Sequence, residues 1–287
     1  MKIDLHIHTK TGSDGAMPVE EVLQEARNRK LNFVSVTDHD SLDAQEKAIA
    51  LAREYGIRYV TGIELNVTFS PKDGKAVSLD FLGYGYDINN RVLKEKLRVL
   101  REHRDWRARE IMQKINVELV KQRIMPLAEI DMQNIAESGD GAIGRPHIAA
   151  YLVNKGIVDS VQQAFDIYLV KCDVPKYPLT LPEASQLIHD AGGIIVLAHP
   201  NDPHGTSLAS VSKDPTQQMK VIADNMLEYI NGVECWHPRH DRPTVDRYLD
   251  FAQKHGLITT GGSDCHQKPV IMGTVNVPSR VSQLFQK

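Results

Sequence analysis

The first hundred residues alternate between two patterns of apolar and polar positions. Residues 2–8 alternate singly, with Ile3, Leu5 and Ile7 on one side and polar residues on the other, which predicts a strand. Apolar residues recur at helical spacing over residues 18–30 and 41–55. Short apolar runs typical of buried strands lie near residues 32–40 and 58–65. Strand, helix, strand, helix, strand predicts a parallel α/β arrangement.

The middle of the chain lacks this alternation. A strand is expected over residues 76–84, followed by a long charged helix from residue 89 to about residue 123. After residue 179 the alternation resumes, with helices expected over 181–190, 214–229 and 244–255 and strands over 193–200, 232–236 and 257–266. Residues 270–277 predict a last short strand. We therefore expect one α/β domain, residues 1–102 and 179–287, with a helical insertion, residues 103–178.

Polar side chains gather at the ends of five predicted strands. They are His6 and His8, Asp38-His39-Asp40, Glu64, His199, and Asp264-Cys265-His266. In a parallel α/β barrel the C-terminal strand ends converge on one face, so these residues would meet. His6 and His8 are two apart on a strand and point to one side, as two imidazoles must to hold one ion. Each residue alone also suits a structural role, such as a cap, but their coincidence favours a metal site.

Composition narrows the class of protein. The chain has 287 residues, 41% of them hydrophobic and 25% charged, as is typical of a globular enzyme. A net charge of -3 gives no general surface for polyanions, so a nucleic-acid substrate would have to be held locally. The start MKIDLHIH does not resemble a signal peptide, no run approaches the roughly 18 apolar residues that span a bilayer, and three separated cysteines predict no disulfide framework. These features favour a cytoplasmic protein without a membrane partner, and no protein partner can be inferred.

A set of motifs points to one family. DLHIHT, SDG, TDHD, GIEL, AHP and GGSDCH occur in this order over nearly the whole chain, and as a set they closely resemble the PHP (polymerase and histidinol phosphatase) superfamily. GRPHIAAYLVNKG followed by AFDIYL is similar to the helical insertion of the PHP subgroup that hydrolyses nucleotide phosphates and short oligonucleotides. The resemblance implies a distorted seven-stranded (β/α) barrel whose helical insertion contributes to the substrate site.

The resemblance also implies two or three divalent metal ions, Mn, Fe or Zn. The first ion would be held by His6, His8, Glu64 and Asp264. Glu64 would bridge to a second ion, completed by His199 and Asp80, and a third would be held by Asp14, His39 and His266. The family usually has His where this chain has Asp80. A carboxylate there would keep the second site and alter its metal preference, unless Asp80 merely caps the strand.

Further residues are candidates for contact with substrate. Arg145 and His147, in GRPH, follow a glycine-rich loop, and an arginine can grip a phosphate bidentately; the alternative is that Arg145 caps carbonyls of the insertion. His240 and Arg239, in HPRHD, follow a predicted strand and could contact phosphate, with His240 also protonating the leaving group. Asp40 is a catalytic candidate that either orients an imidazole or caps the next helix.

Asp4 and Asp38 lie beside expected ligands. They either orient imidazoles or make buried hydrogen bonds to backbone. Trp106 and Trp236 could each stack a nucleobase, but Trp236 follows an apolar strand and could equally be a core residue.

Together these features predict a phosphoesterase in which a hydroxide bridging two metals attacks the phosphate of an AMP-like nucleotide or short oligonucleotide. A histidinol-phosphate-type phosphatase is the rival within the family. Two hypotheses from outside it are amide hydrolysis or deamination on a similar metal cluster, and a non-catalytic nucleotide-binding metal protein. Release of inorganic phosphate, rather than ammonia or a carboxylate, would decide the reaction class.

Overall fold

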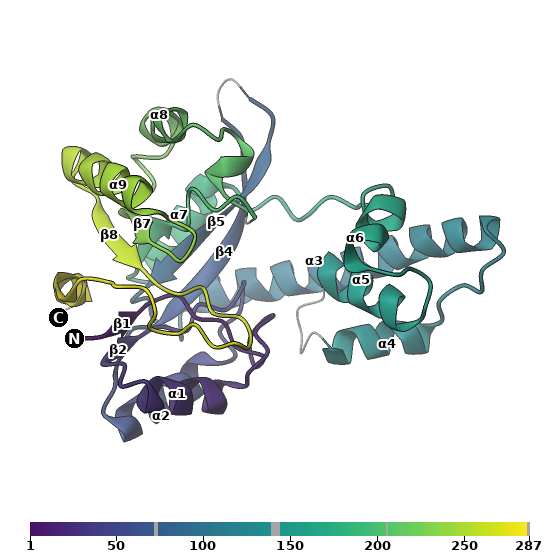
Figure 1. Cartoon of the computed structure of the whole chain (residues 1–287), viewed down its shortest axis with the longest axis horizontal. Coiled ribbons are helices and arrows are strands. Elements are labelled where there is room, and N and C mark those ends of the chain that lie inside the picture. Colours follow the sequence, from purple (N-terminus) through teal and green to yellow (C-terminus); the bar gives the residue numbers. More distant parts are fainter. Residues whose placement is uncertain (72–73, 139–143, 205, 286–287) are drawn as a thin grey trace. The chain divides into compact units, whose positions relative to one another are not determined.

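The structure is a computed structural model that describes residues 1–71, 74–138, 144–204 and 206–285. It divides into two compact units (Figure 1). Unit 1 comprises Met1–Lys94 and Pro178–Lys287, and unit 2 comprises Glu95–Tyr177. Among the described residues, no helix combines the length and the apolar character needed to cross a bilayer.

Unit 1 contains two sheets. The first has three parallel strands, β1 (Ile3–Asp4), β2 (Phe33–Val34) and β3 (Arg58–Tyr59). The second has five strands in sequence order: β4 (Gly62–Phe69), β5 (Val77–Tyr84), β6 (Ile194–Leu197), β7 (Gly232–Trp236) and β8 (Ile258–Gly261). Strand β5 is antiparallel to both β4 and β6, whereas β6, β7 and β8 are parallel. The class is therefore mixed α/β rather than purely parallel.

Short backbone bridges join the two sheets. Ile7, beyond β1, pairs with Cys265, beyond β8, and His39, beyond β2, pairs with Glu64 on β4. The amide of His8 donates to the carbonyl of Cys265 at 3.1 Å. Neither sheet is closed, so the expected seven-stranded barrel is not confirmed. The bridges nevertheless bring together the chain segments that carry the polar motifs.

Helices cover the sheets of unit 1. They are α1 (Val19–Asn28), α2 (Gln45–Tyr55), α7 (Leu181–Asp190), α8 (Pro215–Asn225) and α9 (Arg242–His255). The apolar stripe of α1 is buried in a cluster shared with α2 and the strand segments after β1 and β2. Burial of one large aliphatic side chain stabilises the fold by roughly 1.5–3 kcal/mol. Both α2 and α9 end where a glycine, Gly56 or Gly256, adopts φ +67°, a left-handed conformation that favours glycine.

One predicted strand is split in the structure and another is absent. Residues 58–65 were expected to form one strand but form parts of β3 and β4 in different sheets, because the backbone changes partner between Val60 and Thr61. The amide of Val60 donates to Val34, whereas the carbonyl of Thr61 accepts from Gly85. Residues 270–277 form no strand. The chain turns at Gly273, with φ +67°, and its amide donates to the Asp4 carboxylate at 2.7 Å instead of to a neighbouring strand.

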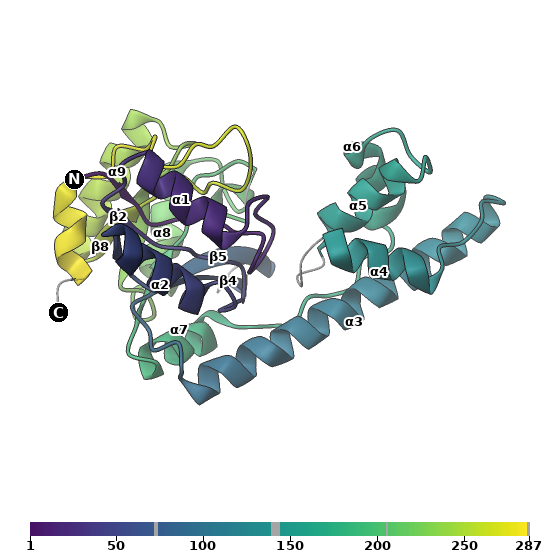
Figure 2. The same ribbon diagram turned by 90° about the horizontal axis from the view of Figure 1, so that it is seen from below.

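Unit 2 is built from helices in its described residues (Figure 2). The long helix α3 (Arg91–Lys121) runs into it and is followed by α4 (Glu129–Ser138), α5 (Arg145–Asn154) and α6 (Val161–Ala164), which continues into a π-helical turn at Phe165–Leu169. Ile111, Ile115 and Leu119 of α3 pack in one apolar core with residues of α4 and α5. Unit 2 thus has its own hydrophobic core.

Candidate metal centre

Four residues form a first cluster of possible metal ligands: His6, His8, Glu64 and Asp264. His6 Nε2 lies 3.1 Å from His8 Nε2 and 3.3 Å from Glu64 Oε2. Asp264 Oδ1 lies 3.3 Å from both imidazole Nε2 atoms. Ligand atoms that share an ion at bonds of ~2.1 Å and angles of ~90–110° lie roughly 3.0–3.4 Å apart. The donor atoms of this cluster therefore fit one divalent ion.

The local backbone holds these residues in place under strain. Asp264 has φ +51° and His199 has φ +22°, in the left-handed region that non-glycine residues rarely adopt. Such strain is maintained when the surrounding structure holds it, and it is common at functional sites. Gly262 allows the close approach, because a Cβ atom there would lie 2.4 Å from the backbone nitrogen of His6.

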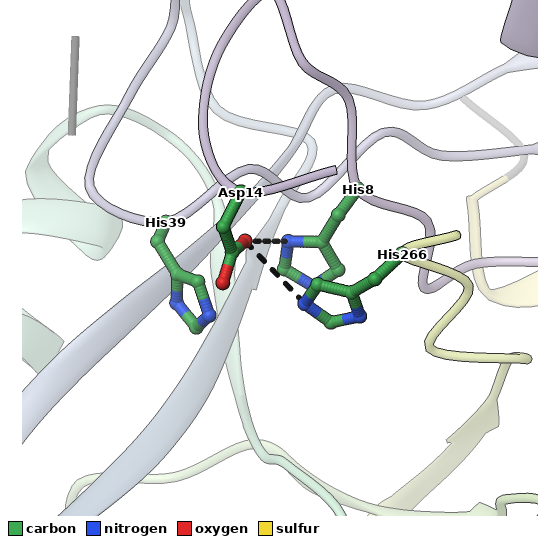
Figure 3. Close-up of side chains that lie close together, drawn as sticks. All are labelled: His8, Asp14, His39 and His266. Carbon is green, nitrogen blue, oxygen red and sulfur yellow. Dashed lines mark ion pairs between the residues drawn. The ribbon is translucent and has the colours of Figure 1, made fainter. Parts of the chain in front are cut away.

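A second cluster contains His8, Asp14, His39 and His266. Figure 3 shows the Asp14 carboxylate between the imidazoles, with Oδ1 at 3.8 Å from His8 Nδ1 and 3.4 Å from His266 Nε2. The rings of His8 and His266 stack at 4.0 Å. This cluster brings together the three residues that the resemblance implied for the third metal. His8 presents one ring nitrogen to each of the first two clusters.

Glu64 and Asp80 meet in a third cluster with His39. Asp80 on β5 pairs with Asn66 on β4, and Asn66 is two residues beyond Glu64. The carboxylates of Glu64 and Asp80 therefore point to the same face of the sheet. Glu64 Oε1 lies 3.0 Å from His199 Nε2, while Oε2 faces the first cluster. Both carboxylates lie within strands rather than at their ends, contrary to the expectation for Glu64. Glu64 nevertheless has the position of a bridging carboxylate.

Electrostatics oppose the cost of burying so many ionisable groups. Burial by itself lowers the pKa of the histidines, but the neighbouring carboxylates outweigh it, raising the pKa of His8 to about 10 and of His199 to about 9. Burial also raises the pKa of Glu64, but the charges of His39 and His6 hold it well below its usual range. In contrast, burial and the charge of Glu64 raise the pKa of Asp80.

Among the described residues, one buried carboxylate oxygen is left without a hydrogen bond. Asp264 Oδ1 makes none, although imidazole nitrogens surround it at 3.3–3.4 Å. A buried polar atom without a partner is costly, and a bound cation would satisfy it. The imidazole and carboxylate donors suit borderline or hard divalent ions. The residues present therefore fit the expected metal.

Glu234 is a functional candidate that sequence reasoning missed. It lies in the middle of β7, fully buried, with its two oxygens 3.1 and 3.2 Å from His6 Nδ1. Its Oε2 also accepts the backbone amide of His199 at 2.8 Å. A carboxylate on the remote imidazole nitrogen fixes the ring so that the other nitrogen faces the ion. The available signal was a charged residue inside the apolar strand GVECW.

His237 and Asp202 extend the site further. They form a fourth cluster with Asp264, in which His237 Nε2 lies 3.4 Å from Asp264 Oδ2. In HPRH, His237 is therefore the histidine that reaches the ligands, whereas sequence reasoning favours His240.

The three aspartates beside the ligands accept hydrogen bonds from backbone amides, and Asp38 also accepts them from hydroxyl groups. Asp4 accepts the amides of Ser263 at 2.8 Å and Gly273 at 2.7 Å. Asp38 accepts the amide of Thr9 at 2.6 Å and the hydroxyl of Ser13 at 2.9 Å. Asp40 accepts the amide of Asn66 at 3.3 Å, and it does not cap α2, which begins four residues after Ser41. Of the two roles considered for Asp4, the buried bond to backbone is the one observed.

Both ring nitrogens of His240 bind backbone groups, whereas the sequence predicts that His240 contacts the substrate. Its Nδ1 donates to the carbonyl of Cys235 at 2.9 Å, and its Nε2 accepts the amide of Asn201 at 3.2 Å. Burial lowers its pKa to about 4, so the ring is neutral. In this conformation neither nitrogen can contact a phosphate. Arg239 is half exposed, with Nε 3.4 Å from Asp202 Oδ2 at the fourth cluster.

The other two substrate candidates belong to unit 2. Arg145 begins α5, and its Nη1 lies 3.2 Å from Asp173 Oδ2. His147 Nδ1 accepts the amide of Gly144 at 3.0 Å, which caps the same helix. Arg145 therefore pairs with a carboxylate rather than capping carbonyls, and His147 has a structural role at the helix start.

Comparisons with known proteins decide the family. The model of the PHP domain matches residues 4–258. The chain belongs to the PHP domain family. Among PHP relatives, it is 31% identical over 271 residues to a 5'-3' exoribonuclease of Haemophilus influenzae, covering 92% of this chain and 90% of the relative. It is 29% identical over 277 residues to a 3',5'-nucleoside bisphosphate phosphatase of Chromobacterium violaceum, covering 92% and 87%.

A solved structure shares the PHP fold. It comes from Bifidobacterium adolescentis and is described as a metal-dependent phosphoesterase. It superimposes with a TM-score of 0.77 at 27% identity, covering 98% of this chain and 94% of the other. The likeness in structure thus includes nearly all of both chains.

Proposed function

We propose that this PHP-domain protein is a metal-dependent phosphoesterase that hydrolyses a phosphate ester of a nucleotide or short oligonucleotide. The observation that carries the proposal is the first cluster, where two imidazoles and two carboxylates converge at distances suited to one ion. Its relatives support the enzyme class, because a bisphosphate phosphatase and an exoribonuclease both cleave phosphate esters. The substrates after which these relatives are named favour a nucleotide over histidinol phosphate.

We assign the ligands to two or three divalent ions, with Mn, Fe and Zn as the proposed metals. His6, His8, Glu64 and Asp264 would hold the first, Glu64, Asp80 and His199 the second, and Asp14, His39 and His266 the third. Ions bound there would supply Lewis-acid stabilisation of phosphate charge and lower the pKa of a water molecule. Glu234 keeps the His6 ring in its ligating orientation.

Positive charge for the substrate phosphate would come from arginine. Arg239 is exposed beside the fourth cluster, where a phosphate oxygen could replace Asp202 as its partner. Arg145 of unit 2 remains a second proposed contact, and a phosphate would have to compete there with Asp173. His240 is not assigned a chemical step, because both its ring nitrogens bind backbone groups.

The test is metal-dependent release of phosphate. Metal-free protein is reconstituted separately with Mn, Fe or Zn and assayed with mononucleotides, 3',5'-bisphosphates, dinucleotides and histidinol phosphate, together with assays for ammonia and carboxylate. We expect inorganic phosphate from a nucleotide phosphomonoester, or a mononucleotide and a nucleoside from the dinucleotides. Release of phosphate from histidinol phosphate alone would favour the rival phosphatase, and release of ammonia or a carboxylate alone would favour another hydrolase.

Matched variants separate the metal site from the rest of the protein. His8→Ala and Asp264→Ala should lose metal and activity, while His255→Ala, at the end of α9, should retain both. If the two ligand variants stay folded and lose metal but still hydrolyse the ester at the wild-type rate, the proposed function is wrong.

A further inference from the structure

Part of the surface of unit 2 combines positive charge with one exposed and two partly exposed aromatic rings. Residues 96–123, most of them in α3, contain nine Lys or Arg and four Asp or Glu, although the whole chain has a net charge of -3. Trp106 lies on α3 with 49% of its surface exposed. A large exposed aromatic side chain on a basic helix is typical of a binding surface rather than of a core.

The chain after the π-helical turn lies along this part of α3. Lys114 Nζ donates to the carbonyl of Asp173 at 2.9 Å, and the guanidinium of Arg107 donates to the carbonyl of Val174. Nearer the start of α3, His103 Nε2 lies 3.3 Å from the carbonyl of Pro175. These contacts fix the positions of the side chains on both segments.

The aromatic part of the surface contains three rings. The His103 ring lies 4.9 Å from Trp106 and 5.5 Å from Tyr177, the latter edge to face. Lys96 Nζ lies 4.5 Å from the centre of the Tyr177 ring. A nucleobase has a flat face that stacks on such rings whatever its identity, and nearby cations favour the contact.

The charged part contains three cations around one carboxylate. Arg107, which is buried, has its Nη2 2.6 Å from Asp173 Oδ1, and the partly exposed Arg145 has its Nη1 3.2 Å from Asp173 Oδ2. Lys114 reaches the backbone of the same residue. One carboxylate cannot neutralise three cations, so the group keeps positive charge. Glu110 lies on the same side of α3, at helical spacing from His103 and Lys114. Because its carboxylate is negative, the attraction for phosphate groups is confined to the cations themselves and does not extend along the whole helix.

We propose that this part of the surface of unit 2 binds a single-stranded oligonucleotide. Trp106, with His103 and Tyr177, stacks a base, and Arg145 and Lys114 attract the phosphate backbone, while the buried Arg107 fixes the position of Asp173. The inference rests on the proposed function and narrows its substrate class to a strand of several nucleotides rather than a mononucleotide. Stacking on aromatic side chains together with contacts from cations to phosphates is the usual mode of single-strand binding.

The test measures binding in the absence of cleavage. Full-length protein in EDTA is titrated into a fluorescently labelled eight-nucleotide single-stranded RNA, and anisotropy gives the dissociation constant. Trp106→Ala should weaken binding roughly 5- to 100-fold, and Trp106→Phe should restore most of it, because stacking on an aromatic ring accounts for that much per base. Circular dichroism should show that both variants are folded, since Trp106 is exposed.

Two further variants separate charge from stacking. Lys114→Gln should reduce the slope of log affinity against log salt concentration by the amount expected for about one phosphate contact. Lys155→Gln is the control, because the Lys155 side chain pairs with Asp131, and it should leave this slope unchanged. The chain has two tryptophans. In a Trp236→Phe background, the remaining fluorescence of Trp106 should be quenched when unlabelled RNA binds.

Three results would overturn the inference. They are equal affinity of wild type and Trp106→Ala, equal affinity for double-stranded RNA of the same length, and equal affinity for polyglutamate. The first two would exclude stacking, and the third would point to an acidic protein partner. Because binding is measured without metal, RNA binding by a protein that releases neither inorganic phosphate nor mononucleotides would refute the proposed function alone. Phosphate release without RNA binding would refute only this inference.

Discussion

The two units of this PHP-domain protein place their charges in opposite ways. In unit 1, ionisable groups lie inside: Glu64 and Glu234 are no more than 1% exposed, and so are His6 and His8. In unit 2 the core is apolar, and most charges are at the surface. Burying charges costs several kcal/mol for each ion unless partners compensate. Unit 1 therefore has the structure expected of an ion-binding site, and unit 2 that expected of a helical bundle that presents a charged surface.

Backbone strain follows the same division. Among the described residues, unit 1 has non-glycine residues with positive φ at Asp40, His199 and Asp264, each within or beside a ligand cluster, and also at Lys30. In unit 2 the corresponding residue is Arg123, which follows the end of α3. Strain at three positions around one site indicates that its geometry is imposed by the surrounding fold. The comparison predicts that substitutions in the ligand clusters of unit 1 mainly affect metal binding and activity, whereas those in the core of unit 2 mainly affect stability.

The largest effect is expected from Glu64→Gln. Glu64 oxygens lie 3.0–3.4 Å from nitrogens of His6, His8, His39 and His199, so an amide would remove the negative charge shared by all of them. We expect at least ~1000-fold lower phosphatase activity, equivalent to about 4 kcal/mol, and a lower metal stoichiometry. Metal analysis and steady-state assays measure these effects. Retained activity with full metal content would show that Glu64 does not bridge two ions.

A substitution in the core of unit 2 should separate stability from metal binding. Ile115 is fully buried in the core of unit 2, and Ile115→Ala should lower the free energy of unfolding by about 2–5 kcal/mol. Hydrogen exchange of the amides of α4 and α5 would report the loss. The metal content should remain at the wild-type level, because the first cluster belongs wholly to unit 1. Loss of metal in this variant would contradict the division between the two units.

Sequence reasoning succeeded where local pattern determines structure. The helices expected over residues 181–190 and 244–255 are confirmed as α7 and α9, since apolar spacing and caps act within a few residues. The split between β3 and β4 was missed, because only the choice of strand partner reveals it. The candidate ligands are brought together by the structure, but their motifs gave no sign of Glu234, which reaches His6 from a distant strand. Such orienting residues depend on tertiary contacts that no local motif encodes.

Glu234→Gln tests this orienting role with a moderate expected effect. An amide can keep one hydrogen bond to His6 but loses the charge that makes the imidazole a stronger ligand. We expect metal affinity to fall roughly 10- to 100-fold while the site still forms at saturating metal. Glu228→Gln, an exposed carboxylate before the same strand, is the control. Competition with a chelator gives the affinities, and equal values for both variants would leave Glu234 with a packing role only.

The smallest effect concerns the buried carboxylate of unit 2, which stabilises the fold instead of binding an ion. Asp131 accepts Lys155 Nζ at 2.7 Å, the Tyr151 hydroxyl at 2.6 Å and the amide of Ala128 at 2.6 Å. These bonds lower its pKa to about 2. Because the folded pKa lies below the unfolded one, the stabilisation is present above about pH 4 and is lost as the pH falls towards 2.

Asp131→Asn should therefore lower the free energy of unfolding by ~1 kcal/mol at pH 7, since most of the shared hydrogen bonds remain possible but the charge is lost. Urea denaturation at pH 7 and at pH 2.5 would measure the difference between wild type and variant, which should shrink at the lower pH. A difference that is independent of pH would show that Asp131 contributes through hydrogen-bond geometry alone. In that case the contribution of Asp131 to stability would not depend on its charge, in contrast to the ligand carboxylates of unit 1.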